Sequence, residues 1–437
     1  MPALFPFRGV RYASSAVRRL DHVVTPPYDV ISPAAQNALY RKSPHNFVRI
    51  VYGRIRPSDR PGHDRYSRAQ ALFHDWLREG IFRTDRAPGL YPYRQRFVHE
   101  GHPYDRWGVL GALRLGDPTI FLHEDTYAVP KQDRMQLLQA VQANLSPIFG
   151  LVEDRDQRYR TALAPWAGRP AITSVMFEGV QHDLWRITAP ATIHRLQALL
   201  EAKPMLLADG HHRYEVALAY REHLRHRNGQ FTRQHPANFM LSYLAAFDAH
   251  DPGILPTHRV LGGLEGWTLD RLAREANAWL SVDRVADAVA MHQAVANRVG
   301  HGQTAVGCYA GHGQWAVIVA RQEDPAIRLD VEMLHRAIVP RCLAPDPAAA
   351  ARLTVTYWQE WAEAVQNVDR GQGTFAWAMY PPTLAQILHC IQGGRRLPQK
   401  STYFIPKPLA GLVIHRLQPA GAPPRRPARL QALAGAV

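Results

Sequence analysis

The sequence contains few cysteines, and none at a spacing that holds a metal. Its 437 residues include three, Cys308, Cys342 and Cys390. They lie too far apart for a Cys-x-x-Cys metal pair and form no evident disulfide framework. We therefore expect three ordinary buried thiols.

Long apolar runs are also missing. No stretch of about 18 apolar residues is present to span a membrane, and the N-terminal residues lack the apolar segment of a signal peptide. We expect a cytoplasmic protein that has no membrane partner.

Four common catalytic signatures are absent. The chain has no Gly-x4-Gly-Lys-Ser/Thr of P-loop enzymes, no Gly-x-Gly-x-x-Gly after a strand, no His-Glu-x-x-His and no Gly-x-Ser-x-Gly. These absences argue against a P-loop enzyme, a dinucleotide-binding Rossmann domain, a zincin protease and a common serine hydrolase. A nucleotide, if bound, must be held by another motif.

The composition is that of a folded protein with excess positive charge. Hydrophobic residues make up 46% of the chain, and 52 Lys and Arg against 37 Asp and Glu give a formal charge of +15. This charge allows nucleic acid as a partner. It is spread along the chain, however, and no recognition helix stands out, so general affinity for anions is the favoured interpretation.

The order of predicted elements indicates an α+β (mixed α/β) fold in three regions. Residues 1–265 form a core with a mixed sheet, residues 266–417 a smaller α+β unit, and residues 418–437 a flexible extension rich in Pro, Arg and Ala. We expect a strand at 47–52, an amphipathic helix at 66–79, and two strands, 91–98 and 106–114, paired around a turn.

The segment 205–221 is the most informative part of the chain. Four apolar residues of a short buried strand are followed by Asp209 and Gly210, a strong turn pair. Apolar spacing then changes to the helical period, so a helix begins near His211. The N–H groups and partial positive charge of a helix start, with His211, His212 and Arg213 added there, suit an anionic ligand such as phosphate.

A simpler interpretation of this segment stays open. Asp209 can be a helix cap and the histidines can be solvated loop residues, because a turn followed by a cap explains Asp209 and Gly210 without any ligand.

Two resemblances favour the phosphate site. Residues 209–215 resemble the phosphate-binding motif of the ParB/sulfiredoxin-like superfamily, which includes partition CTPases, sulfiredoxin and free-serine kinases. The whole chain resembles the family called domain of unknown function 1015, and the matching pieces lie at 6–12, 25–32, 123–126, 133–134, 144–151, 209–215, 255–259 and 398–407. These resemblances imply a ParB/sulfiredoxin-like mixed-sheet core.

Acidic residues near turns are candidates for catalysis. Asp29 follows two prolines in one family piece, and Glu124 follows the apolar strand 119–122. Either can act as a general base or hold Mg²⁺ against phosphate oxygens, so both are candidate catalytic and metal-binding residues, and Asp209 is a third catalytic candidate. Asp29 can equally be a turn residue, and residues 123–126 a cap for the next helix.

Basic residues elsewhere are candidates for further anion contacts. Lys131 and Arg134, which flank Asp133, can close over an anion or simply belong to a solvated helix start. Lys400, between two prolines and two apolar stretches, is a candidate second anion contact, although such a residue singly is more often a satisfied buried group.

These observations predict a nucleotide-binding phosphotransferase or phosphohydrolase that acts on a small hydroxylated metabolite. Gly210, His211, His212, Arg213 and Lys400 would hold the phosphates of ATP, ADP or CTP, with Mg²⁺ as a second cofactor. Serine as the acceptor rests on superfamily analogy alone. The alternatives are a ParB-like, DNA-associated nucleotide switch and a metabolite-binding regulator without catalysis. The chain can also form a homo-oligomer.

Overall fold

The chain folds into two compact units. The structure is a computed structural model that describes residues 4–201, 203–227, 231–248, 254–321 and 327–418. The first unit contains the described residues of Met1–Leu122, Thr126–Pro252 and Pro406–Val437, and the second contains those of His123–Asp125 and Gly253–Ile405. The boundaries drawn from the sequence stay a prediction. The expected extension, including its arginines at 423–429, lies outside the described residues from 419 onward.

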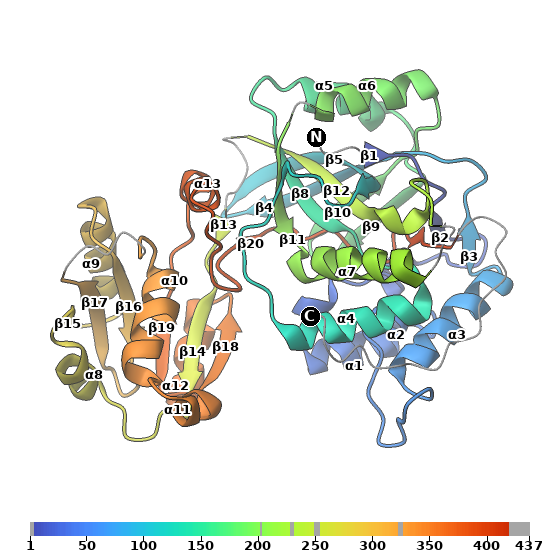
Figure 1. Cartoon of the computed structure of the whole chain (residues 1–437). Helices are drawn as coiled ribbons and strands as arrows, with labels where there is room; N and C mark the ends of the chain where they lie inside the picture. Colours follow the sequence, from blue (N-terminus) through green and yellow to red (C-terminus); the bar gives the residue numbers. More distant parts are fainter. Residues whose placement is uncertain (1–3, 202, 228–230, 249–253, 322–326, 419–437) are drawn as a thin grey trace. The chain divides into compact units, whose positions relative to one another are not determined.

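The first unit is built on a nine-stranded mixed sheet (Figure 1). Its order is β6-β11-β8-β12-β5-β4-β10-β9, and β1 pairs with β5. The β6/β11 and β8/β12 pairs are parallel and the other pairs are antiparallel. The strands are β1 Leu4–Phe5, β4 Tyr91–His99, β5 His102–Arg114, β6 Ile120–Phe121, β8 Ile148–Glu153, β9 Thr173–Phe177, β10 Val180–Leu184, β11 Met205–Asp209 and β12 Phe239–Phe247.

Helices cover both faces of this sheet. Figure 1 shows α5 and α6 on one side, and α4 and α7 side by side on the other. The helices are α1 Pro33–Lys42, α2 Val48–Val51, α3 Arg65–Arg78, α4 Ala128–Val141, α5 Arg158–Leu163, α6 Pro190–Glu201 and α7 His211–Arg227. Short 3-10 turns are η1 Leu20–His22, η2 Tyr28–Val30, η3 Ala164–Gly168 and η4 Pro236–Asn238.

Two apolar cores stabilise the first unit. One joins α5 and α6 to the central strands through residues such as Tyr159, Leu196 and Leu244. The other joins α2, α3 and α4 through residues such as Phe73 and Leu137. Two small ribbons flank this second core, β2 Val10–Tyr12 with β3 Phe82–Thr84, and β7 Ala143–Asn144 with β21 His415–Arg416.

The second unit has a six-stranded sheet of order β15-β17-β16-β19-β14-β18. Its strands are β14 His258–Gly262, β15 Leu280–Val285, β16 Ala305–Tyr309, β17 Trp315–Ala320, β18 Thr354–Trp358 and β19 Phe375–Ala378, and a separate ribbon pairs β13 Ile254–Leu255 with β20 Tyr403–Phe404. Its helices are α8 Leu269–Ala276, α9 Ala288–Gly300, α10 Asp330–Glu332, the π-helix η5 Met333–Leu343, α11 Pro347–Arg352, α12 Trp361–Asp369 and α13 Leu384–Gln392.

The mixed α+β class expected from the sequence is confirmed. The amphipathic helix expected at 66–79 is α3, and the expected strand pair is the β4–β5 hairpin. The three cysteines are buried and free. In the part of the chain that the structure describes, no helix is both long and apolar enough to cross a membrane.

The strand predicted at 47–52 is wrong, because residues 48–51 form helix α2. The side chain of Asn46 accepts a hydrogen bond from the N–H of Val48 at 3.0 Å and donates one to the carbonyl of His22 at 2.7 Å. This local bonding starts a helical turn. Arg49 is the one charged residue in a short run of mostly buried apolar residues. Such a short run has no periodicity that separates helix from strand.

Candidate functional site

The predicted phosphate motif lies where β11 passes into α7. Gly210 joins them with φ +99°, a conformation that residues with a Cβ atom rarely adopt. A Cβ at this position would also lie 2.8 Å from the Ile148 side chain and 3.1 Å from that of Arg213. The turn therefore requires glycine, and it directs the first N–H groups of a 17-residue helix away from the strand.

Asp209 binds two cations at this turn. Helix α7 begins at His211, so the cap position directly before it is occupied by Gly210 and not by Asp209. One carboxylate oxygen of Asp209 pairs with Arg213, one helical turn along the chain, and the other lies 2.5 Å from the ammonium of Lys407. The side chain of Asp209 thus holds Arg213 in a fixed position.

Lys407 lies between two carboxylates. Its ammonium is 2.8 Å from Oδ2 of Asp29 and 2.5 Å from Oδ1 of Asp209, and its side chain is only 9% exposed. Burial favours the neutral amine, but the carboxylates of Asp209 and Asp29 outweigh it and raise the pKa of Lys407 above its ordinary value. The structure therefore brings two of the predicted acids together around a cation that sequence analysis did not single out.

A second buried arginine approaches the same region from α4. The guanidinium carbon of Arg134 lies 3.9 Å from the ring centre of Tyr28. Its Nη1 donates to the carbonyl of Val51 at 3.0 Å, and its Nε donates to Asp133 at 2.7 Å. Burial raises the pKa of Tyr28 to about 12, so its hydroxyl is protonated at neutral pH and can donate a hydrogen bond. Arg134 thus lies in the interior, whereas a solvated helix start would have exposed it.

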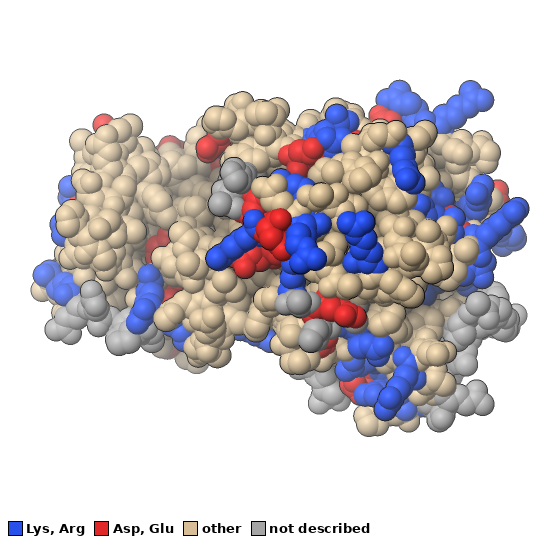
Figure 2. Space-filling model, turned by 90° about the horizontal axis from the view of Figure 1, so that it is seen from above, with Lys and Arg blue, Asp and Glu red and all other residues tan. Residues whose placement is uncertain are grey.

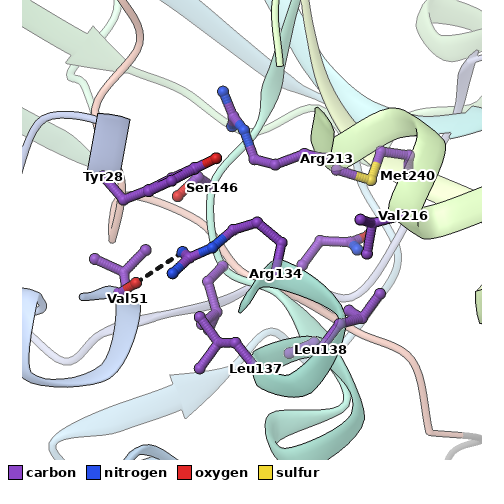
Figure 3. Close-up of a pocket in the computed structure, with 12 residues that line it drawn as sticks. Tyr28, Val51, Arg134, Leu137, Leu138, Ser146, Arg213, Val216 and Met240 are labelled. Atoms are coloured by element: carbon purple, nitrogen blue, oxygen red, sulfur yellow. Dashed lines mark hydrogen bonds between the residues drawn. The ribbon is translucent and has the colours of Figure 1, made fainter. Parts of the chain in front are cut away.

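Arg134, Arg213 and Tyr28 line a small cavity of about 50 Å³ (Figure 3). The complete lining is Tyr28, Val51, Arg134, Leu137, Leu138, Ala143, Asn144, Leu145, Ser146, Arg213, Val216 and Met240. Among the described residues, the buried hydroxyl oxygen of Ser146 has no hydrogen-bond partner. Buried hydroxyl groups in proteins generally have a hydrogen-bond partner, which can be an ordered water molecule.

The two histidines of the motif have other surroundings. His211 is buried, and Nε2 of His212 accepts a hydrogen bond from the N–H of Tyr127 at 3.1 Å. Beside them, Thr126 donates to Glu215 at 2.5 Å. Neither histidine lines the cavity, so of the three basic residues at the helix start only Arg213 does. Phosphate binding by His211 and His212 stays a prediction.

Glu124 and Lys400 belong to the second unit, where they lie together. The carboxylate of Glu124 accepts hydrogen bonds from the N–H of Lys400 at 3.2 Å, and from the N–H and hydroxyl of Thr402 at 3.0 and 2.9 Å. Nη2 of Arg259 donates to the carbonyl of Lys400 at 2.7 Å. These bonds fix the segment around Lys400, where φ is +60°. Residues 123–126 do not cap the next helix, because α4 begins at Ala128 and its cap position is Tyr127.

The metal-binding roles of Asp29 and Glu124 also stay predictions. Within the described ranges, no group of three or more His, Cys, Asp or Glu residues is arranged to hold a metal ion. Mg²⁺ in nucleotide sites commonly needs only one or two carboxylates, because phosphate oxygens and water complete its coordination. Asp29 has the chemistry for such a role in the first unit.

A family model described as "Protein of unknown function (DUF1015)" matches residues 4–337, more than half of the chain. The chain belongs to this family. No curated protein sequence matches it. Residues that sequence analysis passed over, Ser146 and Lys407, lie in the segments 144–151 and 398–407 that resembled DUF1015, and this was the only signal that could have found them.

Several solved structures show a distant likeness. A free serine kinase in complex with AMP has 12% identity and a TM-score of 0.35, over 65% of this chain and 83% of that one. A conserved hypothetical protein from Pyrococcus furiosus has 14% identity and a TM-score of 0.34, over 66% of this chain and 90% of that one. C-terminally truncated SbnI from Staphylococcus aureus has 12% identity and a TM-score of 0.35, over 69% of this chain and 85% of that one. With TM-scores this low, function must be argued from the geometry of the site.

The substitution Lys407→Met tests how much the ion pairs of Lys407 with Asp29 and Asp209 contribute to stability. The change removes the positive charge between the buried Asp209 and the half-buried Asp29. Breaking a buried ion pair costs up to about 3–5 kcal/mol of unfolding free energy. Chemical denaturation measures this loss. The control is Lys42→Met, an exposed lysine over the Phe177 ring, for which at most about 1 kcal/mol is expected. Equal small losses in both variants would contradict the role of Lys407.

Proposed function

We propose that the cavity at the start of α7 holds a phosphate group of a nucleotide, and that the protein transfers a phosphoryl group to a small hydroxylated metabolite. The observation that carries this proposal is the buried hydroxyl of Ser146, which has no hydrogen-bond partner among the described residues and lies in a cavity also lined by Arg134 and Arg213. A hydroxyl and two guanidinium groups are a common set of donors for phosphate oxygens.

Both arginines keep donors for a ligand. A guanidinium has five N–H donors. Arg213 forms two hydrogen bonds with the described residues, to Pro147 and Asp209, which leaves three donors, and Arg134 forms three, two with Asp133 and one with Val51, which leaves two. Their existing partners fix the two groups in advance, so that a phosphate would bind with little loss of side-chain entropy.

The size of the cavity limits what it can hold. A volume of about 50 Å³ has space for a few water molecules. It therefore accommodates part of a small ligand, while the base and ribose of a nucleotide would lie outside it. We place the phosphate at the polar side of the cavity, against Ser146, Arg134 and Arg213.

In the proposed reaction, the hydroxyl oxygen of the acceptor forms a bond to the terminal phosphorus as the bond to the leaving nucleotide breaks. Arg134 and Arg213 stabilise the charge on the phosphoryl oxygens. Asp29, next to Tyr28 in the cavity wall, accepts the proton of the acceptor hydroxyl. Mg²⁺ bound by Asp29 and the phosphates would neutralise further negative charge when present.

The face of the protein in Figure 2 shows no continuous basic stripe of the kind that follows duplex DNA. On the face shown in Figure 2, Asp and Glu side chains are interspersed among Lys and Arg. No described contact points to DNA, and the DNA-associated switch stays an alternative that a turnover measurement separates from the enzyme.

Turnover is tested by ³¹P NMR of the protein with Mg²⁺ and ATP, ADP or CTP, together with a pool of small hydroxylated metabolites. We expect a new phosphate ester signal with one acceptor. Arg213→Gln removes a charged donor, a loss of about 1.5–3 kcal/mol, so the rate should fall about 10- to 150-fold. Arg225→Gln, on the exposed end of the same helix, should keep the rate. Nucleotide binding without any new signal would favour a regulator or a switch.

Ser146→Ala separates ligand binding from stability. Because the hydroxyl has no partner among the described residues, its removal should leave the free energy of unfolding unchanged or slightly increased. Binding of inorganic phosphate, measured by calorimetry, should weaken about fivefold, the effect of one hydrogen bond of roughly 1 kcal/mol. Loss of stability with unchanged phosphate affinity would contradict the proposed site.

A further inference from the structure

The cavity has an apolar side that phosphate binding does not use. Seven of its twelve lining residues are apolar, namely Val51, Leu137, Leu138, Ala143, Leu145, Val216 and Met240. Among the polar ones, Asn144 is already engaged, since its carboxamide oxygen accepts hydrogen bonds from the N–H of Leu241 at 3.0 Å and pairs with His415 at 3.2 Å. Polar donors are therefore concentrated at Tyr28, Ser146 and the two arginines.

The side chains around the cavity divide it into two parts. Figure 3 shows Leu137, Leu138, Val216 and the stem of Arg134 on one side, with the ring of Tyr28 and the hydroxyl of Ser146 on the other. A charged or hydroxylated group against the apolar part would lose its hydration without gaining a partner. A methyl or methylene group there would instead gain by leaving water.

We propose that the acceptor is a small alcohol with a short aliphatic group of one to three carbons, which occupies the apolar part of the cavity while its oxygen meets the phosphoryl group at the polar part. This inference rests on the proposed function and names the substrate class of the same site. An acceptor whose only substituents are charged or hydroxylated fits the cavity less well.

The test uses stable analogues of the phosphorylated product. Calorimetry compares inorganic phosphate with methyl, ethyl, n-propyl and n-butyl phosphate. Affinity should rise about fourfold for each carbon atom buried, reach a maximum at ethyl or propyl phosphate, and fall at butyl phosphate because the cavity of about 50 Å³ is then full.

Variants of Val216 test whether this maximum belongs to the cavity. Val216→Ala enlarges the apolar part, so the maximum should move to a longer chain, and Val216→Ile reduces it, so the maximum should move to a shorter one. Leu218→Ala, on the same helix but absent from the cavity lining, is the matched control and should keep the original maximum. Thermal melts verify that each variant is folded.

The outcomes separate this inference from the proposed function. Phosphate binding that Ser146→Ala weakens, with no gain from alkyl groups, would overturn the apolar acceptor and leave the phosphate site standing. An affinity that rises with every added carbon and is the same in the Val216 variants would also overturn the inference, because it would indicate binding to a general apolar surface. If neither phosphate nor any ester binds, both proposals fail.

Discussion

The geometry of the candidate site in the first unit depends on one interaction. The ammonium of Lys407 lies between the carboxylates of Asp29 and Asp209. A buried charge is stable only with partners, so this lysine obliges three distant segments of the chain to meet: the turn η2, the end of β11, and the segment that begins at Pro406. Asp209 in turn fixes the position of Arg213, because its second carboxylate oxygen pairs with the guanidinium of that residue. The position of the basic residue at the helix start is thus set by a lysine almost 200 residues further along the chain.

The same arrangement explains how one small cavity combines charge with apolar surface. Arg134 and Arg213 are each anchored by a carboxylate and a backbone carbonyl, so their guanidinium groups stay in place without a ligand. Pre-organised donors of this kind require little rearrangement when charge develops on a bound group. Their aliphatic stems and the neighbouring leucines leave the remaining wall apolar, which would exclude water from a reacting phosphoryl group.

Much of the fold could be predicted from local sequence. The change of period after Gly210 located the start of α7, and two strand-like runs on either side of the turn at Gly101 located the β4–β5 hairpin. Residues 47–52 were assigned to the wrong element because so short a run of mostly buried residues has no period that separates helix from strand. Sequence analysis singled out Asp209, but its partner Lys407 could not be derived from spacing, since only the tertiary fold brings them together. The hydroxyl of Ser146 was missed for the same reason.

The position of a bound oxyanion tests the central claim most directly. Crystals grown with tungstate, a heavy analogue of phosphate, would reveal that position by anomalous scattering. The account predicts a peak within hydrogen-bond distance of the Ser146 hydroxyl and of the guanidinium groups of Arg134 and Arg213, which Ser146→Ala weakens. A strong peak elsewhere on the protein, with the cavity holding only water, would contradict it.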